Sequence, residues 1–87
     1  MALKAIMIGR KLELKRSALA ELTAKDAEFE TRSAEIEKAI GEATTDEEQK
    51  VVEEAMTKYT EDLDAHNAEK EKLSAEIEGL EKDLEDA

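Results

Sequence analysis

The sequence has 87 residues, a formal net charge of -11, 43% charged side chains, 2% aromatic side chains and no proline, tryptophan or cysteine. This composition is typical of coiled coils and long helices, and so short a chain buries only a thin core, so we expect a single helical domain over residues 1–87. The absence of cysteine excludes a disulfide framework and thiolate metal sites, and the longest apolar run, residues 5–8, is too short to span a membrane.

The first predicted helix, or arm, covers about residues 3–42. From Ile8 onward its apolar residues recur at alternating spacings of four and three, the heptad pattern by which one helix packs against another. The apolar members of this seam are Ile8, Leu12, Leu19, Leu22, Phe29, Ile36 and Ile40. Polar residues occupy three further seam positions, Lys15, Asp26 and Ser33. Two interpretations stay open: such residues fix the register of a coiled coil, or they mark a loosely packed bundle.

Basic residues are concentrated at the start of the chain. Residues 1–25 carry six Lys or Arg against two acidic residues, whereas residues 26–87 carry seven against twenty-two. The candidate partner-facing basic arm consists of Lys4, Arg10, Lys11, Lys15 and Arg16. It is either a solvated helix face or a segment that attracts an acidic partner, such as nucleic acid, a membrane surface or the acidic remainder of the same chain. The chain as a whole repels phosphate and has almost no aromatic side chains to stack on bases, so we expect no nucleic acid and no membrane as partner.

An elbow is predicted at about residues 41–46. The heptad seam resumes after this stretch with a displacement of two residues, which corresponds to roughly 200° of helix rotation. One straight helix would therefore carry its two apolar stripes on nearly opposite sides. Gly41 is suited to the left-handed conformation that ends a helix, and Thr45 with Glu48 three positions later forms a candidate capping box. These signals predict that one helix stops and another begins.

The second predicted arm covers about residues 46–86. Its apolar seam members are Val52, Met56, Tyr59, Leu63, Leu73, Ile77, Leu80 and Leu84, with His66 and Lys70 at polar positions. Folding at the elbow brings residue i near residue 88 minus i. This register pairs Phe29 with Tyr59, Leu22 with His66, Leu12 with Ile77 and Ile8 with Leu80. We therefore predict an all-α fold, a long antiparallel helical hairpin or coiled coil, whose thin core favours self-association into larger bundles.

Few residues are suited to catalysis or metal binding. Asp62 and Glu69 share a helical face with His66, the only histidine, at spacings that permit shared metal coordination. Zinc sites draw three or four strong ligands and di-iron bundles repeat a Glu-x-x-His motif, so we expect His66 to pack across the hairpin instead. The serines have no neighbouring histidine, and the three glycines are scattered. We expect no enzyme: no catalytic, cofactor-binding or metal-binding residue, and no small-molecule substrate.

Two ordered blocks near the N-terminus, "LKAIMIGRKLELKR" and "LTAKDAEFETRSAEIEKAI", are followed by a short polar break and a second acidic helix. This arrangement resembles the N-terminal delta domain of HK97-type tailed-phage major capsid proteins. The resemblance implies a built-in scaffold that precedes the shell-forming domain, guides procapsid assembly and is then removed by proteolysis. It implies as partners copies of the chain, neighbouring capsid subunits, and a phage maturation protease or portal. The implied location is the bacterial host cytoplasm, in the interior of the immature procapsid.

Two rival hypotheses remain. One is a small coiled-coil module that binds or regulates another protein, with the basic N-terminal arm docking on an acidic surface. The other is a bundle enzyme of the metal-binding kind, which requires His66 for its function. The scaffold hypothesis differs from both, because it expects the chain to continue past Ala87 into a large β-rich domain.

Overall fold

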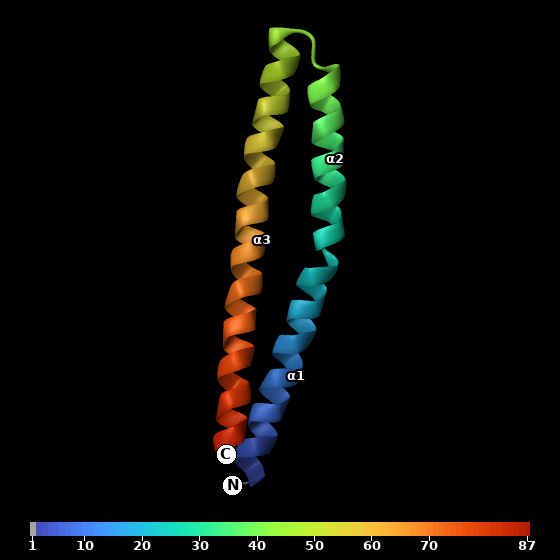
Figure 1. The fold of residues 1–87 in the computed structure, drawn as a ribbon. Coiled ribbons are helices and arrows are strands. Elements are labelled where there is room, and N and C mark those ends of the chain that lie inside the picture. The colour runs from blue at the N-terminus through green and yellow to red at the C-terminus, as the bar shows by residue number, and fades with distance from the viewer. Residues whose placement is uncertain (1) are drawn as a thin grey trace. The chain divides into compact units, whose positions relative to one another are not determined.

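The computed structural model describes residues 2–87 and confirms the predicted all-α fold. Over these residues the elements are α1 (Ala2–Ala24), α2 (Asp26–Glu42) and α3 (Asp46–Asp86) (Figure 1). Residues 43–45 connect α2 to α3. Antiparallel packing of α3 against the two shorter helices gives the coiled-coil geometry that the heptad seam predicts.

The stretch expected as one helix over residues 3–42 is interrupted at Lys25. This residue keeps right-handed helical dihedrals, with φ at -75° and ψ at -11°. Its carbonyl oxygen accepts hydrogen bonds from the N–H groups of Glu28 at 3.0 Å and Phe29 at 3.4 Å. The shorter bond spans three residues, as in a 3₁₀ turn, and such turns are frequent at helix termini. The interruption is therefore a local change of hydrogen bonding, and neither proline nor glycine causes it.

The end of α2 differs from the sequence prediction. Gly41 lies inside α2, and no residue among 2–87 has a positive φ, so the expected left-handed helix end at Gly41 is wrong. The helix ends because Ala43 turns into an extended conformation, with φ at -77° and ψ at 109°. The N–H group of Ala43 still donates to the carbonyl oxygen of Ala39 at 3.0 Å, which satisfies one of the last carbonyls of the helix.

The capping box predicted at the start of α3 is confirmed. The Glu48 N–H group donates to Oγ1 of Thr45 at 3.1 Å, and the Thr45 N–H group donates to Oε1 of Glu48 at 3.3 Å. The hydroxyl groups of Thr45 and Thr44 also donate to Oε1 of Glu48. These bonds, with that of the Thr45 hydroxyl first, lower the pKa of Glu48. Asp46 and Glu47 add negative charge to the first turn, where the helix dipole favours it.

We expect Thr45→Ala to destabilise the folded chain by about 1 kcal/mol, the usual cost of losing an N-cap side chain. Urea unfolding followed by circular dichroism measures this change. Thr57→Ala is the matched control, because the Thr57 hydroxyl only donates to the carbonyl oxygen of Glu53 within the same helix. Its loss should change the free energy of unfolding by less than about 0.5 kcal/mol. Equal effects of the two substitutions would show that the capping box does not stabilise α3.

The helices form two packing units. The terminal unit consists of α1 and the last part of α3, Asn67–Ala87, and the hairpin unit is Lys25–His66, which contains α2 and the first part of α3. In Figure 1, α2 and the first part of α3 lie side by side and run in opposite directions from the turn. In the terminal unit α1 lies along the last part of α3, again antiparallel.

Buried apolar side chains among residues 2–87 are confined to the terminal unit. Ile8, Leu12 and Ile77 form a cluster against which Leu19 and Leu80 pack. Leu73 is buried as well, and Leu12 is the most enclosed, with 2% of its surface exposed. This cluster contains both members of two pairs expected from the antiparallel register, Leu12 with Ile77 and Ile8 with Leu80.

The hairpin unit is held by aromatic and charged side chains. The rings of Phe29 and Tyr59, a pair expected from the register, have centroids 6.2 Å apart. His66 is buried, and its ring centroid lies 4.7 Å from that of Phe29. The register prediction paired His66 with Leu22, whereas the contacts of His66 in this unit are with Phe29 and Asp26. The His66 ring on α3 thus packs beside the Phe29 ring on α2. A register that pairs residues by their seam positions does not predict this contact.

Candidate interaction surfaces

The predicted seam residues differ in how far the helix packing covers them. Ile8, Leu12, Leu73 and Ile77 are buried, and Leu19, Leu22, Phe29, Ile36, Val52, Tyr59, Leu63 and Leu80 are half-buried. Ile40, Met56 and Leu84 are exposed. The seam is therefore used mainly within the chain, and its exposed members lie near the turn and near the end of α3.

Two of the three polar seam positions in the first arm have partners on the facing helix. Nζ of Lys15 lies 2.5 Å from Oε2 of Glu76 in the terminal unit. Nε2 of His66 lies 2.7 Å from Oδ1 of Asp26 in the hairpin unit, at hydrogen-bond distance, with the ring nitrogen donating. Ser33, the third position, is exposed. Specific cross-helix partners of this kind are what a register-fixing residue needs, so the structure favours that interpretation over a loose bundle.

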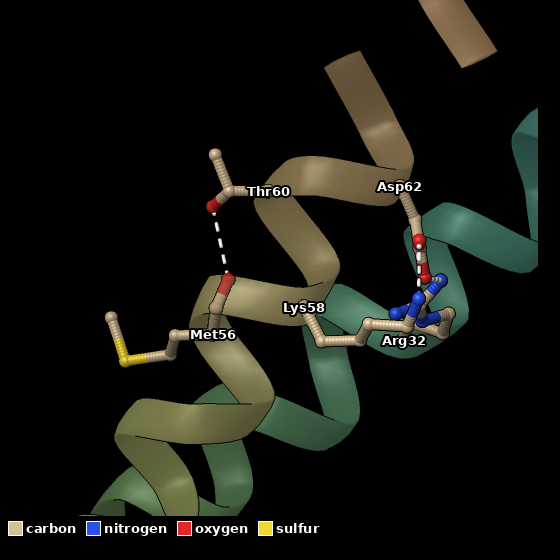
Figure 2. A network of polar contacts seen from close by, with 5 residues as sticks. All are labelled: Arg32, Met56, Lys58, Thr60 and Asp62. Carbon is tan, nitrogen blue, oxygen red and sulfur yellow. Dashed lines mark hydrogen bonds and ion pairs between the residues drawn. The ribbon is translucent and has the colours of Figure 1, made fainter. Parts of the chain in front are cut away.

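A polar network lies on one side of the hairpin unit (Figure 2). Arg32 on α2 and Lys58 on α3 both contact the carboxylate of Asp62 at 3.0 Å. The hydrogen bond from Lys58, together with the Arg32 contact, lowers the pKa of Asp62. The Arg32 guanidinium also lies 5.5 Å from the ring centroids of Phe29 and of Tyr59, where cation–π attraction operates. Arg32 therefore links the ion pair to the aromatic layer.

The pKa of Glu76 is lowered by the hydrogen bond from Lys15 across the helices. A carboxyl group whose pKa lies below its usual value of 4.5 stabilises the folded chain above about pH 4.5, and this contribution is lost as the pH falls through the lowered pKa. We therefore expect Glu76→Gln to lower the free energy of unfolding at pH 7 and to have no effect near pH 2. Denaturant titrations at several pH values measure this difference.

The control for this titration is Glu78→Gln, at an exposed position on the same helix. It removes the same charge from the same strongly acidic arm, so it corrects for the general repulsion between carboxylates. If the Glu76 and Glu78 variants follow the same pH dependence, the Lys15–Glu76 pair contributes no specific stability.

The five residues of the candidate basic arm divide into two groups. Lys15 and Arg16 contact Glu76 and Glu81 on α3, so part of the basic segment is used by the acidic part of the same chain. Lys4, Arg10 and Lys11 are exposed. Arg10 contacts only a neighbour on its own helix in the described ion pairs, Glu13 at 3.1 Å. The side chains of these three cations are exposed to solvent.

A second apolar stripe lies on α1, outside the predicted heptad seam. Leu3, Ile6, Met7 and Leu14 are all exposed, between 54% and 80% of their surface. Their spacings of three, four and seven place them on one side of the helix, away from the buried Ile8 and Leu12. We call Leu3, Ile6, Met7 and Leu14 the outer face of α1. The signal was present in the sequence, because the apolar residues of α1 lie on more than one side of the helix, but a single heptad seam includes only one of these stripes.

A groove runs between α2 and α3 in the hairpin unit. One part, of about 290 Å³, is lined by Ile40, Ala43, Gln49, Val52, Glu53 and Met56. An adjoining hollow shares Ile40 and Met56 and is lined further by Ser33, Ile36, Glu37, Tyr59 and Thr60. We call these two parts together the α2–α3 groove. Figure 2 shows the Met56 side chain extending away from the Arg32–Asp62 pair, so the groove and the charged network occupy different sides of α3.

The surroundings of His66 do not form a metal site in the described part of the chain. Residues 2–87 contain no group of three or more His, Cys, Asp or Glu side chains placed to hold a metal ion. Asp62 contacts Arg32 and Lys58, and His66 contacts Asp26. Over the same residues, none of the helices has the length and apolar character needed to cross a membrane.

No protein-family model, no curated protein and no solved structure matches this chain. The arrangement of side chains is therefore the basis for inferring what the chain does. It consists of antiparallel helix pairs, a small buried core, exposed apolar stripes and cations on α1 that are open to solvent.

Proposed function

We propose that the chain is a built-in scaffolding segment of an HK97-type phage major capsid protein. It brings capsid subunits together through weak helix–helix contacts during procapsid assembly and is then removed by a phage protease. One observation carries the scaffolding role: among residues 2–87, four apolar side chains are buried while eight large ones are exposed. A chain that leaves this much apolar surface uncovered is suited to association with further helices.

Weak contacts suit a scaffold because attachment to a shell domain raises the local concentration of the segment. Tethered copies experience effective concentrations in the millimolar range, at which contacts too weak for the free chain become populated. The same contacts separate when the tether is cut. A strongly acidic segment would also repel DNA that later enters the shell, since the chain has a net charge of -11.

The capsid assignment is supported by the resemblance of the two N-terminal blocks and the acidic second arm to the delta domain. Under this proposal the chain acts in the host cytoplasm, inside the immature procapsid. Its partners are copies of itself, neighbouring capsid subunits, and the maturation protease or portal. The coding sequence should then continue past Ala87 into a shell domain.

An in-frame deletion of residues 1–87 from the coat protein tests this proposal. We expect the shortened coat protein to stay soluble but to form few shells of uniform size when expressed in bacteria, as seen by electron microscopy and sedimentation velocity. The intact coat protein, expressed in parallel, is the control. Uniform shells of normal size from the shortened protein would overturn the capsid proposal.

A second candidate function is a small module that binds or regulates another protein. The observation in its favour is the exposed basic set, Lys4, Arg10 and Lys11, beside the outer face of α1. Sedimentation equilibrium of the 87-residue chain from low micromolar to near-millimolar concentration separates the two functions. A scaffold gains mass and helicity together as the concentration rises, whereas a self-sufficient module stays a helical monomer.

A further inference from the structure

The outer face of α1 has the chemistry of a helix that docks into an acidic apolar site. Leu3, Ile6, Met7 and Leu14 supply the apolar stripe, and they are among the most exposed apolar side chains described. Residues 2–14 carry three Lys or Arg against one acidic residue. From Leu3 to Leu14 the stripe extends over about 16 Å of helix, at 1.5 Å per residue.

The α2–α3 groove has the complementary chemistry. Its walls are apolar, with Ile40 and Met56 exposed at 51% and 43%, and Glu37 and Glu53 add carboxylates to the lining. The hairpin unit around it is strongly acidic, since residues 25–66 carry five Lys or Arg against fourteen Asp or Glu. Along α3 the lining runs from Gln49 to Thr60, about 16 Å, which equals the length of the apolar stripe on α1.

We propose that the outer face of α1 in one copy of the chain docks into the α2–α3 groove of a second copy. An amphipathic helix laid into an apolar groove is a common mode of protein recognition, with side chains spaced by three, four and seven residues as anchors. Here the anchors are apolar, the flanking charges are basic, and the groove that receives them is acidic. The inference rests on the self-association within the proposed function and names the two surfaces that carry it.

Charge disfavours the two symmetric contacts, in which α1 packs on α1 of the second copy or the α2–α3 groove packs on the same groove. A contact between the outer faces of two α1 helices would bring Lys4, Arg10 and Lys11 of both copies together. A contact between two α2–α3 grooves would bring Glu37 and Glu53 of both copies together and leave the outer face of α1 uncovered. Like charges across an interface are unfavourable. Docking of the outer face of α1 into the α2–α3 groove instead places basic side chains opposite acidic ones.

This contact joins two different surfaces, so each copy keeps one surface open after the first contact. Such a heterologous contact adds further copies until the ring closes or the supply ends. The expected behaviour of the 87-residue chain is therefore growth beyond the dimer with rising concentration. Added salt should weaken the association, because it screens the exposed cations and carboxylates.

Two double variants test the pairing. The face variant carries Leu3→Gln and Met7→Gln, and the groove variant carries Ile40→Gln and Met56→Gln; glutamine keeps the helix propensity high and adds no charge. Sedimentation equilibrium should show each variant alone as a monomer, with its association constant at least tenfold below that of the parent chain. A 1:1 mixture should form dimers and nothing larger, because the intact face of one variant fits the intact groove of the other.

Val51→Gln is the matched control, since Val51 is an exposed apolar residue on α3 outside the groove lining. It should associate like the parent chain, and circular dichroism at low micromolar concentration, where the parent chain is itself dissociated, should show unchanged helicity for all variants. Dimers of the groove variant alone would indicate a contact between α1 helices and overturn the inference. Dimers of the face variant alone, or a parent chain that stays monomeric, would also overturn it.

Thiol cross-linking gives a second readout that does not depend on disrupting the surfaces. The chain has no cysteine, so Met7→Cys and Met56→Cys introduce single thiols on the face and in the groove. After mixing with a short bis-maleimide, the mixed Met7–Met56 product should exceed either homodimer. A predominance of homodimers would contradict the pairing. If the chain associates through other surfaces, this inference is wrong but the proposed function stands. If coat protein that lacks residues 1–87 forms uniform shells, the capsid proposal is wrong but this inference stands.

Discussion

Leu12→Ala is expected to destabilise the folded chain by about 2–4 kcal/mol, the range for removing a buried leucine side chain from a packed core. Leu12 is the most enclosed side chain of the described residues, and it lies in a cluster with Ile8 and Ile77. The substitution leaves a cavity, and α1 and the last part of α3 have few other apolar side chains that could move to fill it. Urea unfolding followed by circular dichroism, at micromolar concentration to limit self-association, gives the free energy of unfolding.

Leu14→Ala provides the matched control for this measurement. Leu14 belongs to the same helix and undergoes the same chemical change, but 54% of its surface is exposed. Its replacement should change the free energy of unfolding by less than about 0.5 kcal/mol, as is usual at exposed positions. If the two variants unfold alike, the terminal unit does not have the core described here.

His66→Ala should destabilise the folded chain by about 1–3 kcal/mol, because it removes a buried ring and a cross-helix hydrogen bond. The ring packs against Phe29, and its Nε2 atom donates to Asp26. The Asp26 side chain is 42% exposed, so its carboxylate stays hydrated when the bond is lost. Most of the cost should therefore come from lost packing.

His66→Leu separates packing from hydrogen bonding. Leucine refills most of the volume beside Phe29 without a polar group, so this variant should lie within about 1 kcal/mol of the parent chain. Asn67→Ala, at the exposed neighbouring position, controls for the change of residue on α3. A leucine variant as unstable as the alanine variant would show that the bond to Asp26 dominates.

Much of the fold could be predicted because heptad spacing and capping chemistry are local signals. Thr45 and Glu48 lie three residues apart, and their side chains form hydrogen bonds within the first turn of α3. The antiparallel arrangement follows from the displaced seam, and the contact of Phe29 with Tyr59 follows from counting residues back from the turn.

Other features of the fold depend on hydrogen bonds and side-chain contacts that the spacing of apolar residues does not indicate. Lys25 has no sequence signature of a helix end, and at the interruption its carbonyl oxygen accepts a bond that spans three residues in addition to the regular bond that spans four. Gly41 permits a left-handed end without requiring it, and Ala43 ends α2 instead. His66 contacts a ring and a carboxylate on α2 because those side chains are long enough to reach it from positions other than the expected partner.

The candidate surfaces were predicted only in part. The seam and the basic residues can be recognised from the heptad spacing and the charge. Whether a given cation forms an ion pair within the chain depends on which carboxylates lie opposite it on the facing helix. Lys15 meets Glu76, whereas Lys4 is exposed. The outer face of α1 was not predicted, because a heptad pattern defines one stripe on each helix and these residues lie outside it.

The uneven placement of buried side chains has a consequence for backbone amide exchange. Every buried aliphatic side chain described lies in the terminal unit, while the hairpin unit is held by rings, ions and a capped turn. Segments with few buried apolar contacts open at lower free energy than the rest of a protein. Deuterium should therefore enter residues 25–66 first, while α1 around Leu12 keeps its protons longest. A protease acting on the folded chain would find its first accessible backbone in the same region.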